Sequence, residues 1–363
     1  MALHAFWWLI IARRAHLDRV LSLLGSPVVP RGTHGALMQS APRGTASQPI
    51  PVLGISVPRG TSFQPNPGDG HYLGETALEI SANLLPNPVA RVIAIANQKG
   101  GVGKTTTAVN LAASLALAEK RTLLIDGDPQ GNATSGIGVE RGSFETTTYH
   151  VLLREASIAG ARRTGVQFPR LDVLPATPDL AGAEIELVSA IGRDTRMREA
   201  IALVRHEYDF ILIDCPPSLG LITLNMLAAA NTLLIPLQCE YYALEGLSQL
   251  LNTVHLIQHG VNPSLGISGV LLTMYDARLN LSRQVAADAR EYFGTQVFNT
   301  VVPRNVRLAE APGFGKPIVL YDVMSIGAQA YMAVANELIA REAQLLTQPH
   351  TATERDTAHE ASA

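Results

Sequence analysis

The chain changes character near residue 91. From there, short apolar runs alternate with longer stretches whose apolar residues recur every three or four positions, the spacing of one helix face. The runs predict strands at residues 92–96, 122–125, 171–174, 210–213, 232–237, 269–273 and 297–302. The amphipathic stretches predict helices at residues 105–118, 181–189, 244–259, 281–293 and 328–343. Because strands that alternate with helices form βαβ units, we expect a doubly wound α/β fold with a mostly parallel sheet flanked by helices.

The same pattern sets the domain boundaries. Ten of the 22 prolines lie between Ser26 and Pro88, where neither helix nor strand periodicity can be sustained. We therefore expect residues 1–90 to form a low-complexity, Pro/Gly-rich extension that is mostly disordered. Residues 91–346 are predicted to form the folded domain, and residues 347–363 a disordered polar tail.

A glycine-rich loop, Lys-Gly-Gly-Val-Gly-Lys-Thr-Thr, lies between the first predicted strand and the first predicted helix. Glycines let successive backbone N–H groups turn toward phosphate oxygens, and the N-terminus of the following helix adds a positive dipole. Lys104 would neutralise the β and γ phosphates, and the Thr105 hydroxyl would bind Mg²⁺, which prefers hard oxygen ligands. The chain has no Asn-Lys-x-Asp sequence for guanine, so ATP is favoured over GTP. The predicted ATP-binding residues of this P-loop are Lys99, Gly100, Gly101, Val102, Gly103, Lys104, Thr105 and Thr106.

Acidic residues follow two of the predicted strands. Asp126 and Asp128 come after the strand at 122–125, and Asp214 comes directly after the strand at 210–213. Parallel strands end at one edge of the sheet, so we expect these carboxylates near the P-loop, where they can orient water or hold the magnesium shell. An acid at a strand end also serves turns, which is the alternative for each residue alone. The predicted magnesium site comprises Thr105, Asp126, Asp128 and Asp214, with the acids acting through water and Asp214 also counted in the ATP site.

Lys99 is an additional cation in the loop, and Gln98 stands where the generic P-loop has glycine. A second lysine beside the phosphates can stabilise charge that develops during phosphoryl transfer, and a solvated lysine at a loop entrance is the less favoured alternative. With this lysine the loop resembles the deviant Walker ATPases, in which it reaches across a sandwich dimer to the partner's ATP. The resemblance implies that Lys99 and Lys104 are catalytic, that Asp128 positions the hydrolytic water and that Asp126 supports the metal.

Three later segments narrow the resemblance to the chromosome-partitioning branch, ParA or Soj. They are residues 238–246, 272–278 and 302–312, which read QCEYYALEG, LTMYDAR and VPRNVRLAEAP. The resemblance covers residues 91–346 and implies that Pro303 and Asn305 face the adenine and that Arg278 and Arg307 contact nonspecific double-stranded DNA. Loop arginines can grip phosphates through salt-sensitive contacts, but they also form ordinary surface or dimer salt bridges. Gly127 departs from the pattern, because an apolar residue is expected between the two acids.

The family resemblance also implies partners. Members form a homodimer on ATP binding, bind DNA of the nucleoid and respond to a ParB-type centromere-binding protein, so we expect a cytoplasmic, nucleoid-associated ATPase. Whether it serves a chromosome or a plasmid stays open. Because members commonly begin close to the first strand, we expect translation to begin downstream of Met1.

Composition limits the alternatives. The formal net charge of -3 excludes a generally cationic protein, so a DNA contact must come from a local basic patch. The only two cysteines, Cys215 and Cys239, lie in apolar stretches, which suits a reducing compartment. An electron-transfer protein like the nitrogenase iron protein would use two cysteines per subunit for a shared cluster, but buried small residues explain these two better.

The sequence also disfavours two other classes of protein. A Min-like membrane ATPase needs a basic amphipathic helix at its C-terminus, whereas residues 351–360 are polar and partly acidic, so we expect no stable membrane association. The apolar run at residues 5–12 is too short to span a bilayer. A sequence-specific repressor would need a helix-turn-helix domain, which the Pro-rich region before residue 91 cannot supply.

Overall fold

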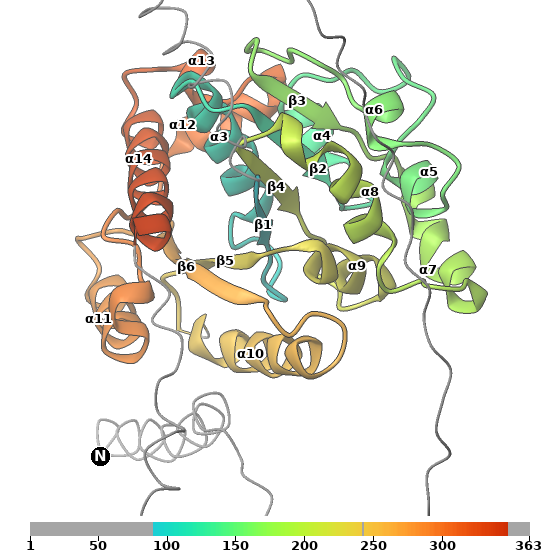
Figure 1. Ribbon diagram of the computed structural model, residues 1–363. Coiled ribbons are helices and arrows are strands. Elements are labelled where there is room, and N and C mark those ends of the chain that lie inside the picture. Colours follow the sequence, from blue (N-terminus) through green and yellow to red (C-terminus); the bar gives the residue numbers. More distant parts are fainter. Residues whose placement is uncertain (1–89, 242, 348–363) are drawn as a thin grey trace, which may run out of the picture. The chain divides into compact units, whose positions relative to one another are not determined.

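The computed structural model describes residues 90–241 and 243–347 (Figure 1). Its six strands are β1 (Arg91–Ile95), β2 (Thr122–Asp126), β3 (Leu171–Leu174), β4 (Phe210–Asp214), β5 (Thr232–Gln238) and β6 (Gly266–Thr273). They form one sheet in the order β3-β2-β4-β1-β5-β6, and every neighbouring pair is parallel. The predicted doubly wound α/β fold is confirmed. Nearly all of the expected N-terminal extension and C-terminal tail lies outside the described residues.

The strands are apolar along their length because helices cover both faces of the sheet. Every residue of β2, β4 and β5 is buried. Side chains alternate between the faces, so Ile93 and Ile95 of β1 join one core cluster while Val92 and Ala94 join the other. This two-sided burial is typical of parallel sheets and explains the continuous apolar runs in the sequence.

The helices divide between the two core clusters (Figure 1). The cluster of Ile93 and Ile95 is covered by α3 (Lys104–Leu117), α4 (Asn132–Gly136), α12 (Val306–Glu310), α13 (Ile318–Tyr321) and α14 (Ile326–Thr347). The opposite cluster is covered by α5 (Thr148–Leu152), α6 (Ile158–Ala161), α7 (Ala183–Glu186), α8 (Arg196–Val204), α9 (Leu221–Ala229), α10 (Ala243–His259) and α11 (Asn280–Phe293). Short 3₁₀ turns complete the fold: η1 (Pro178–Gly182), η2 (Leu187–Ser189), η3 (Arg205–Glu207), η4 (Gly294–Gln296) and η5 (Ala311–Phe314).

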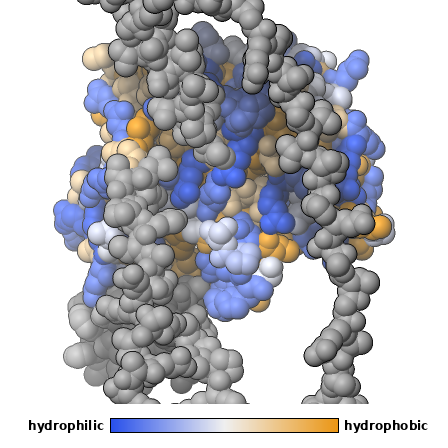
Figure 2. All heavy atoms as spheres, in the orientation of Figure 1, coloured by the Kyte–Doolittle hydropathy of each residue, from blue (hydrophilic) through white to orange (hydrophobic). Residues whose placement is uncertain are grey.

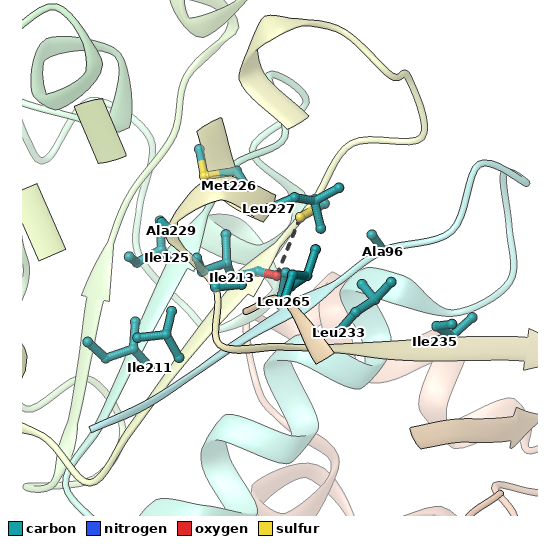
Figure 3. Close-up of a cluster of buried hydrophobic side chains, with 14 of the residues drawn as sticks. Ala96, Ile125, Ile211, Ile213, Met226, Leu227, Ala229, Leu233, Ile235 and Leu265 are labelled. Atoms are coloured by element: carbon teal, nitrogen blue, oxygen red, sulfur yellow. Dashed lines mark hydrogen bonds between the residues drawn. The ribbon is translucent and has the colours of Figure 1, made fainter. Parts of the chain in front are cut away.

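The cluster under α9 shows how the strand ends are held. Ile125, Ile213 and Ile235 come from three different strands and gather with Met226 and Leu227 of α9 (Figure 3). None of these five side chains is measurably exposed. Burying an isoleucine or leucine side chain fully contributes roughly 1.5–3 kcal/mol to the free energy of folding, so this packing stabilises the carboxyl ends of the central strands.

The visible part of the surface in Figure 2 is mainly hydrophilic, with separate hydrophobic areas between the charged residues. Among the described residues the most exposed large hydrophobic side chain is Ile191, which is 90% exposed, followed by Ile185 and Met324 at 78% and 77%. Val188 lies between the first two in sequence and is 58% exposed, and Val323 and Ile326 flank Met324 at 51% and 54%.

The predicted strand at residues 297–302 is wrong. This segment runs beside β6 but pairs with it in a single isolated bridge, between Val270 and Val297. The backbone N–H groups of Asn299 and Thr300 instead donate hydrogen bonds of 2.8 and 2.9 Å to the carboxylate of Glu337 in α14. Because a helix side chain binds the middle of the segment, a continuous strand ladder cannot form.

The helix predicted at residues 181–189 is not continuous. It consists of η1, α7 and η2, although the buried residues Leu180, Ala183 and Leu187 keep the spacing of one helix face. Gly182 lies at the junction and has low helix propensity. The prediction also missed α9, in which seven of nine residues are buried, so no polar face marks it as amphipathic.

Candidate functional site

The P-loop leaves β1, which lies between β4 and β5, and it ends where α3 begins at Lys104. Gly101 and Gly103 have φ angles of 74° and 88°, in the left-handed region that glycine adopts without strain. The Thr273 hydroxyl, at the end of β6, donates a 2.8 Å hydrogen bond to the carbonyl of Val102. The loop is thus shaped by its glycines and tied to the sheet by a residue far along the chain.

Asn97 fixes the entrance of the loop. Its Nδ2 donates to the carbonyl of Pro236 in β5 at 2.8 Å, and its Oδ1 accepts from the backbone N–H of Lys99 at 3.0 Å. The side chain is almost fully buried. Sequence reasoning missed Asn97 and Thr273 because neither belongs to the phosphate-binding pattern itself.

Lys104 points into the loop. Its Nζ donates a 3.0 Å hydrogen bond to the carbonyl of Lys99, and the residue is only 7% exposed. Burial lowers the pKa of Lys104, and the negative charges of Asp214 and Asp128 act in the opposite direction. The predicted phosphate-binding lysine therefore lies within a buried charged group at the ends of the central strands.

Asp126 is held by the turn that follows it. Its Oδ1 accepts from the Asp128 backbone N–H at 3.1 Å, and its Oδ2 accepts from the Thr134 N–H and hydroxyl at 2.7 and 2.6 Å. Burial raises the pKa of Asp126 to about 6, while these hydrogen bonds and the nearby charge of Asp128 contribute smaller effects. Asp126 organises the loop that carries Asp128, and Thr134 is a partner that sequence reasoning did not identify.

Asp214 lies beside Asp126 in the register of β4 and β2, and it is fully buried. Neither of its carboxylate oxygens has a regular hydrogen bond to any described residue, although the Thr105 hydroxyl is near enough to lower the pKa in part. Burial, followed by the charge of Asp126, raises the pKa of Asp214 well above its ordinary value. A buried carboxylate that lacks a regular hydrogen-bond donor fits a nearby cation or its hydration shell, so Asp214 and Thr105 suit Mg²⁺.

The extra lysine of the loop has an acidic partner. Lys99 Nζ lies 3.2 Å from Glu240 Oε2, and the two side chains are 31% and 45% exposed. Glu240 follows β5 and was not among the predicted site residues. The backbone N–H of Gly100 and Gly101 belongs to the same exposed part of the loop, where a Cβ on either glycine would meet no atom within 4 Å.

The segment predicted to face the adenine lies against the loop after β6. Tyr275 forms a bridge with Pro303, and the Arg304 N–H donates to the Tyr275 carbonyl at 3.1 Å. Asn305 caps α12, because its Oδ1 accepts from the Arg307 N–H at 2.8 Å. The structure thus brings the loop after β6, which holds Arg278, next to the segment of Pro303 and Asn305. The adenine contact itself stays a prediction.

Both arginines predicted to bind DNA are exposed and paired with acids. The Arg278 guanidinium donates to both carboxylate oxygens of Asp276, at 2.9 and 2.7 Å, and lowers the pKa of Asp276 to about 2. Arg307 lies 3.0 Å from Glu310 and 3.7 Å from Asp322. Their DNA role stays a prediction, and each arginine must exchange or share a carboxylate to hold a phosphate.

The two cysteines do not suit an iron–sulfur cluster shared between subunits. Cys215 and Cys239 are 1% and 4% exposed, and both belong to the hydrophobic core. Burial raises the pKa of both thiols, that of Cys239 to about 11. Sulfur atoms enclosed in this way cannot reach a second chain.

Among the helices of the described residues, none has the length and apolar character needed to cross a bilayer. The tail that the membrane alternative depends on lies outside those residues.

Comparison with known proteins supplies the family. Residues 90–267 match a family model described as an AAA domain. The chromosome partitioning protein ParA of Myxococcus xanthus is 57% identical over 254 residues, covering 70% of this chain and 89% of the relative. The sporulation initiation inhibitor protein Soj of Bacillus subtilis is 56% identical over 253 residues, covering 69% and 99%.

One similar solved structure contains a bound nucleotide. Cobyrinic acid a,c-diamide synthase from Mycobacterium smegmatis, with bound ATP analog and magnesium, matches with a TM-score of 0.62 and 37% identity, covering 70% of this chain and 96% of that one. The fold, the P-loop with its second lysine and the relatives that share more than half of their aligned residues agree. This chain belongs to the ParA/Soj family of chromosome-partitioning ATPases.

Proposed function

We propose that this ATPase uses MgATP to close a sandwich dimer that holds nonspecific DNA. The observation that carries the proposal is the position of the two lysines of the loop. Lys104 is buried and bonded within its own P-loop, whereas Lys99 is partly exposed and pairs with Glu240 outside the loop. A single chain needs one lysine at its phosphates, so the exposed one is available to the nucleotide of a second chain.

The acids would have different roles in ATP hydrolysis. Thr105 and Asp214 would hold the magnesium ion and its water shell, and the ion would neutralise charge on the β and γ phosphates. Asp128 lies on the turn fixed by Asp126 and would orient the attacking water. Lys99 from the partner would stabilise charge that develops during transfer.

Dimerisation would create the DNA-binding surface. Arg278 and Arg307 are exposed in segments that adjoin through Tyr275 and Arg304, so one chain presents two arginines, each paired with an acid, beside the segment predicted to face the adenine. Two such sets of arginines on one duplex multiply the avidity without any new contact. Hydrolysis, stimulated by a ParB-type partner, would separate the chains and release the DNA. We infer a cytoplasmic protein that cycles on and off the nucleoid.

The proposal is tested by measuring mass and DNA binding in parallel. Light scattering gives the mass, and co-sedimentation with a DNA duplex gives DNA binding. Both are measured in three conditions: with a non-hydrolysable ATP analogue, with ADP and without nucleotide. We expect a DNA-binding dimer only with the analogue, a monomer for Lys99→Ala, and a dimer that has lost DNA for Arg278→Ala with Arg307→Ala.

Arg170→Ala is the matched control, because Arg170 forms an exposed pair with Glu119 elsewhere on the domain. A Lys99→Ala protein that dimerises and binds DNA like the parent would remove the basis of the proposal. A liposome arm separates the membrane alternative, since sedimentation with vesicles but not with DNA would favour a Min-like function.

A further inference from the structure

Glu240 joins three elements of the site. Its carboxylate lies 3.2 Å from Lys99 Nζ of the P-loop and 3.9 Å from Arg304 Nη2 of the segment predicted to face the adenine. Gln238, the last residue of β5, donates a side-chain hydrogen bond to the same carboxylate. The backbone of Glu240 also returns toward β5, because its N–H donates to the Gln238 carbonyl at 2.8 Å. Gln238 therefore orients the acid, and all three charged side chains, those of Glu240, Lys99 and Arg304, are partly exposed.

The pairing of Lys99 with Glu240 is made within one chain. If Lys99 binds the nucleotide of a second chain, its Nζ must leave its position 3.2 Å from Glu240 to contact the phosphates of that nucleotide. Dimer closure would then have to break the pair in both chains. A partly exposed ion pair of this kind changes an equilibrium by about two- to fivefold, so two pairs change a dimerisation constant by about 4- to 25-fold.

We propose that Glu240 is a positioning residue that holds Lys99 within its own chain and thereby raises the ATP concentration at which dimers form. This inference rests on the proposed function, because it assumes that Lys99 acts in a dimer. The monomer–dimer equilibrium shifts only when an interaction stabilises one of the two states more than the other. The Glu240–Lys99 ion pair does so because it forms in the monomer and is broken in the dimer.

Arg304 makes the restraint sensitive to the nucleotide. Arg304 lies in the segment of Pro303 and Asn305 and faces Glu240 Oε1, whereas Lys99 faces Oε2, so its positive charge partly offsets the attraction of the carboxylate for Lys99. Movement of that segment toward Glu240 would weaken the hold on Lys99, and movement away would strengthen it. Removing Arg304 should therefore have the opposite effect to removing the charge of Glu240.

The experiment is a titration of the full chain with a non-hydrolysable ATP analogue, followed by analytical ultracentrifugation. Glu240→Gln keeps the size of the side chain and loses its charge. We expect the dimerisation constant to rise about 4- to 25-fold for Glu240→Gln and to fall for Arg304→Gln. Glu119→Gln, which removes an acid from the exposed pair with Arg170, is the matched control and should leave the titration unchanged.

Glu240 could also act by simple repulsion of ATP, and a double-mutant cycle with Lys99→Met separates that effect from the restraint on Lys99. The affinity of each variant for a fluorescent ATP analogue is measured. If Glu240 acts through Lys99, Glu240→Gln raises analogue affinity in the parent and leaves it unchanged in the Lys99→Met background. Equal gains in both backgrounds would overturn the proposal, and so would weaker dimerisation of Glu240→Gln. A parent chain that forms no ATP-dependent dimer would instead contradict the proposed function.

Discussion

Thr134 holds the carboxylate of Asp126 with both of its donors. The Thr134 N–H and hydroxyl lie 2.7 and 2.6 Å from Asp126 Oδ2, and both residues are fully buried. The hydroxyl oxygen also accepts a 2.9 Å hydrogen bond from the Ala176 N–H, just beyond β3. A threonine in the short helix α4 thus links the ends of two strands through one acid.

We expect Thr134→Val to lower the free energy of unfolding by about 1–3 kcal/mol, because the isosteric side chain leaves Asp126 and the Ala176 N–H short of a buried partner. Urea unfolding at pH 7 without nucleotide measures the change. Thr134→Ser keeps the hydroxyl and should lose less. Equal losses for valine and serine would assign the effect to packing rather than to the hydrogen bonds.

The raised pKa of Asp126 predicts a pH dependence of stability. The ordinary pKa of this carboxyl is 3.8, and burial raises it to about 6 in the folded protein. Between these values the folded state holds a proton that the unfolded chain has released. The contribution to stability is therefore complete below about pH 4 and is lost as pH rises through 6, with a total on the order of 3 kcal/mol. The pKa of Asp214 is raised as well, so its effect has the same sign.

Urea unfolding without magnesium or nucleotide, at steps from pH 4 to 7, measures this dependence. Asp126→Asn should flatten the fall in stability, leaving the part due to Asp214. Asp276→Asn is the control, because Arg278 lowers the pKa of Asp276 to about 2 and its contribution lies below pH 4. A parent protein whose stability rises from pH 4 to 6 would contradict the assignment.

Gly127, which stands where the family pattern has an apolar residue, lies at a close approach of two strand ends in this chain. A Cβ at this position would lie 2.8 Å from the Asp214 carbonyl oxygen and 3.1 Å from Met226 Cε. Since overpacking a buried site costs about 1–3 kcal/mol, we expect Gly127→Ala to lower stability by that amount and to reduce ATPase activity by displacing Asp214. Thermal unfolding and phosphate release measure the two effects.

Gly313→Ala serves as the control for Gly127→Ala, because a Cβ at Gly313 meets no atom within 4 Å. If Gly127→Ala matched Gly313→Ala in stability and activity, the close approach would have no energetic consequence.

The sequence predicted the sheet well and the connections less well. β4 was predicted to within one residue of its observed bounds, because a central strand of a parallel sheet is covered on both faces and leaves a continuous apolar run. The segment at residues 297–302 has the same apolar character, but Glu337 binds its backbone, and no local pattern reveals a contact made 37 residues away. Short helices such as α4 are below the length at which periodicity is visible.

The candidate site divides in the same way. Motif spacing made Lys99, Lys104 and the three acids candidates, since phosphate and metal chemistry restricts the residue types at those positions. The residues that position them, Asn97 and Glu240, are single polar residues whose function depends on tertiary contacts. Spacing alone could not distinguish them from ordinary surface or turn residues.

The last prediction concerns the proposed DNA surface. Arg278 is 88% exposed at its side chain, yet both of its donor positions facing Asp276 are occupied by that carboxylate. Asp276→Asn would free the guanidinium for a phosphate, so we expect tighter ATP-dependent binding and a steeper salt dependence, by about 0.9 in the log–log slope for each added phosphate contact. Fluorescence anisotropy of a labelled duplex from 50 to 200 mM salt, roughly the range over which such contacts are lost, measures both.

Glu119→Gln changes the net charge by the same amount in a different exposed pair, that of Arg170. It therefore separates a local contact from a general rise in positive charge. If Arg278 meets DNA, only Asp276→Asn raises the slope, and adding Arg278→Ala to it reverses the gain. Equal gains for the two acid-to-amide variants would mean that net charge explains the effect, and the Arg278–Asp276 pair would then be the ordinary surface salt bridge that its geometry also permits.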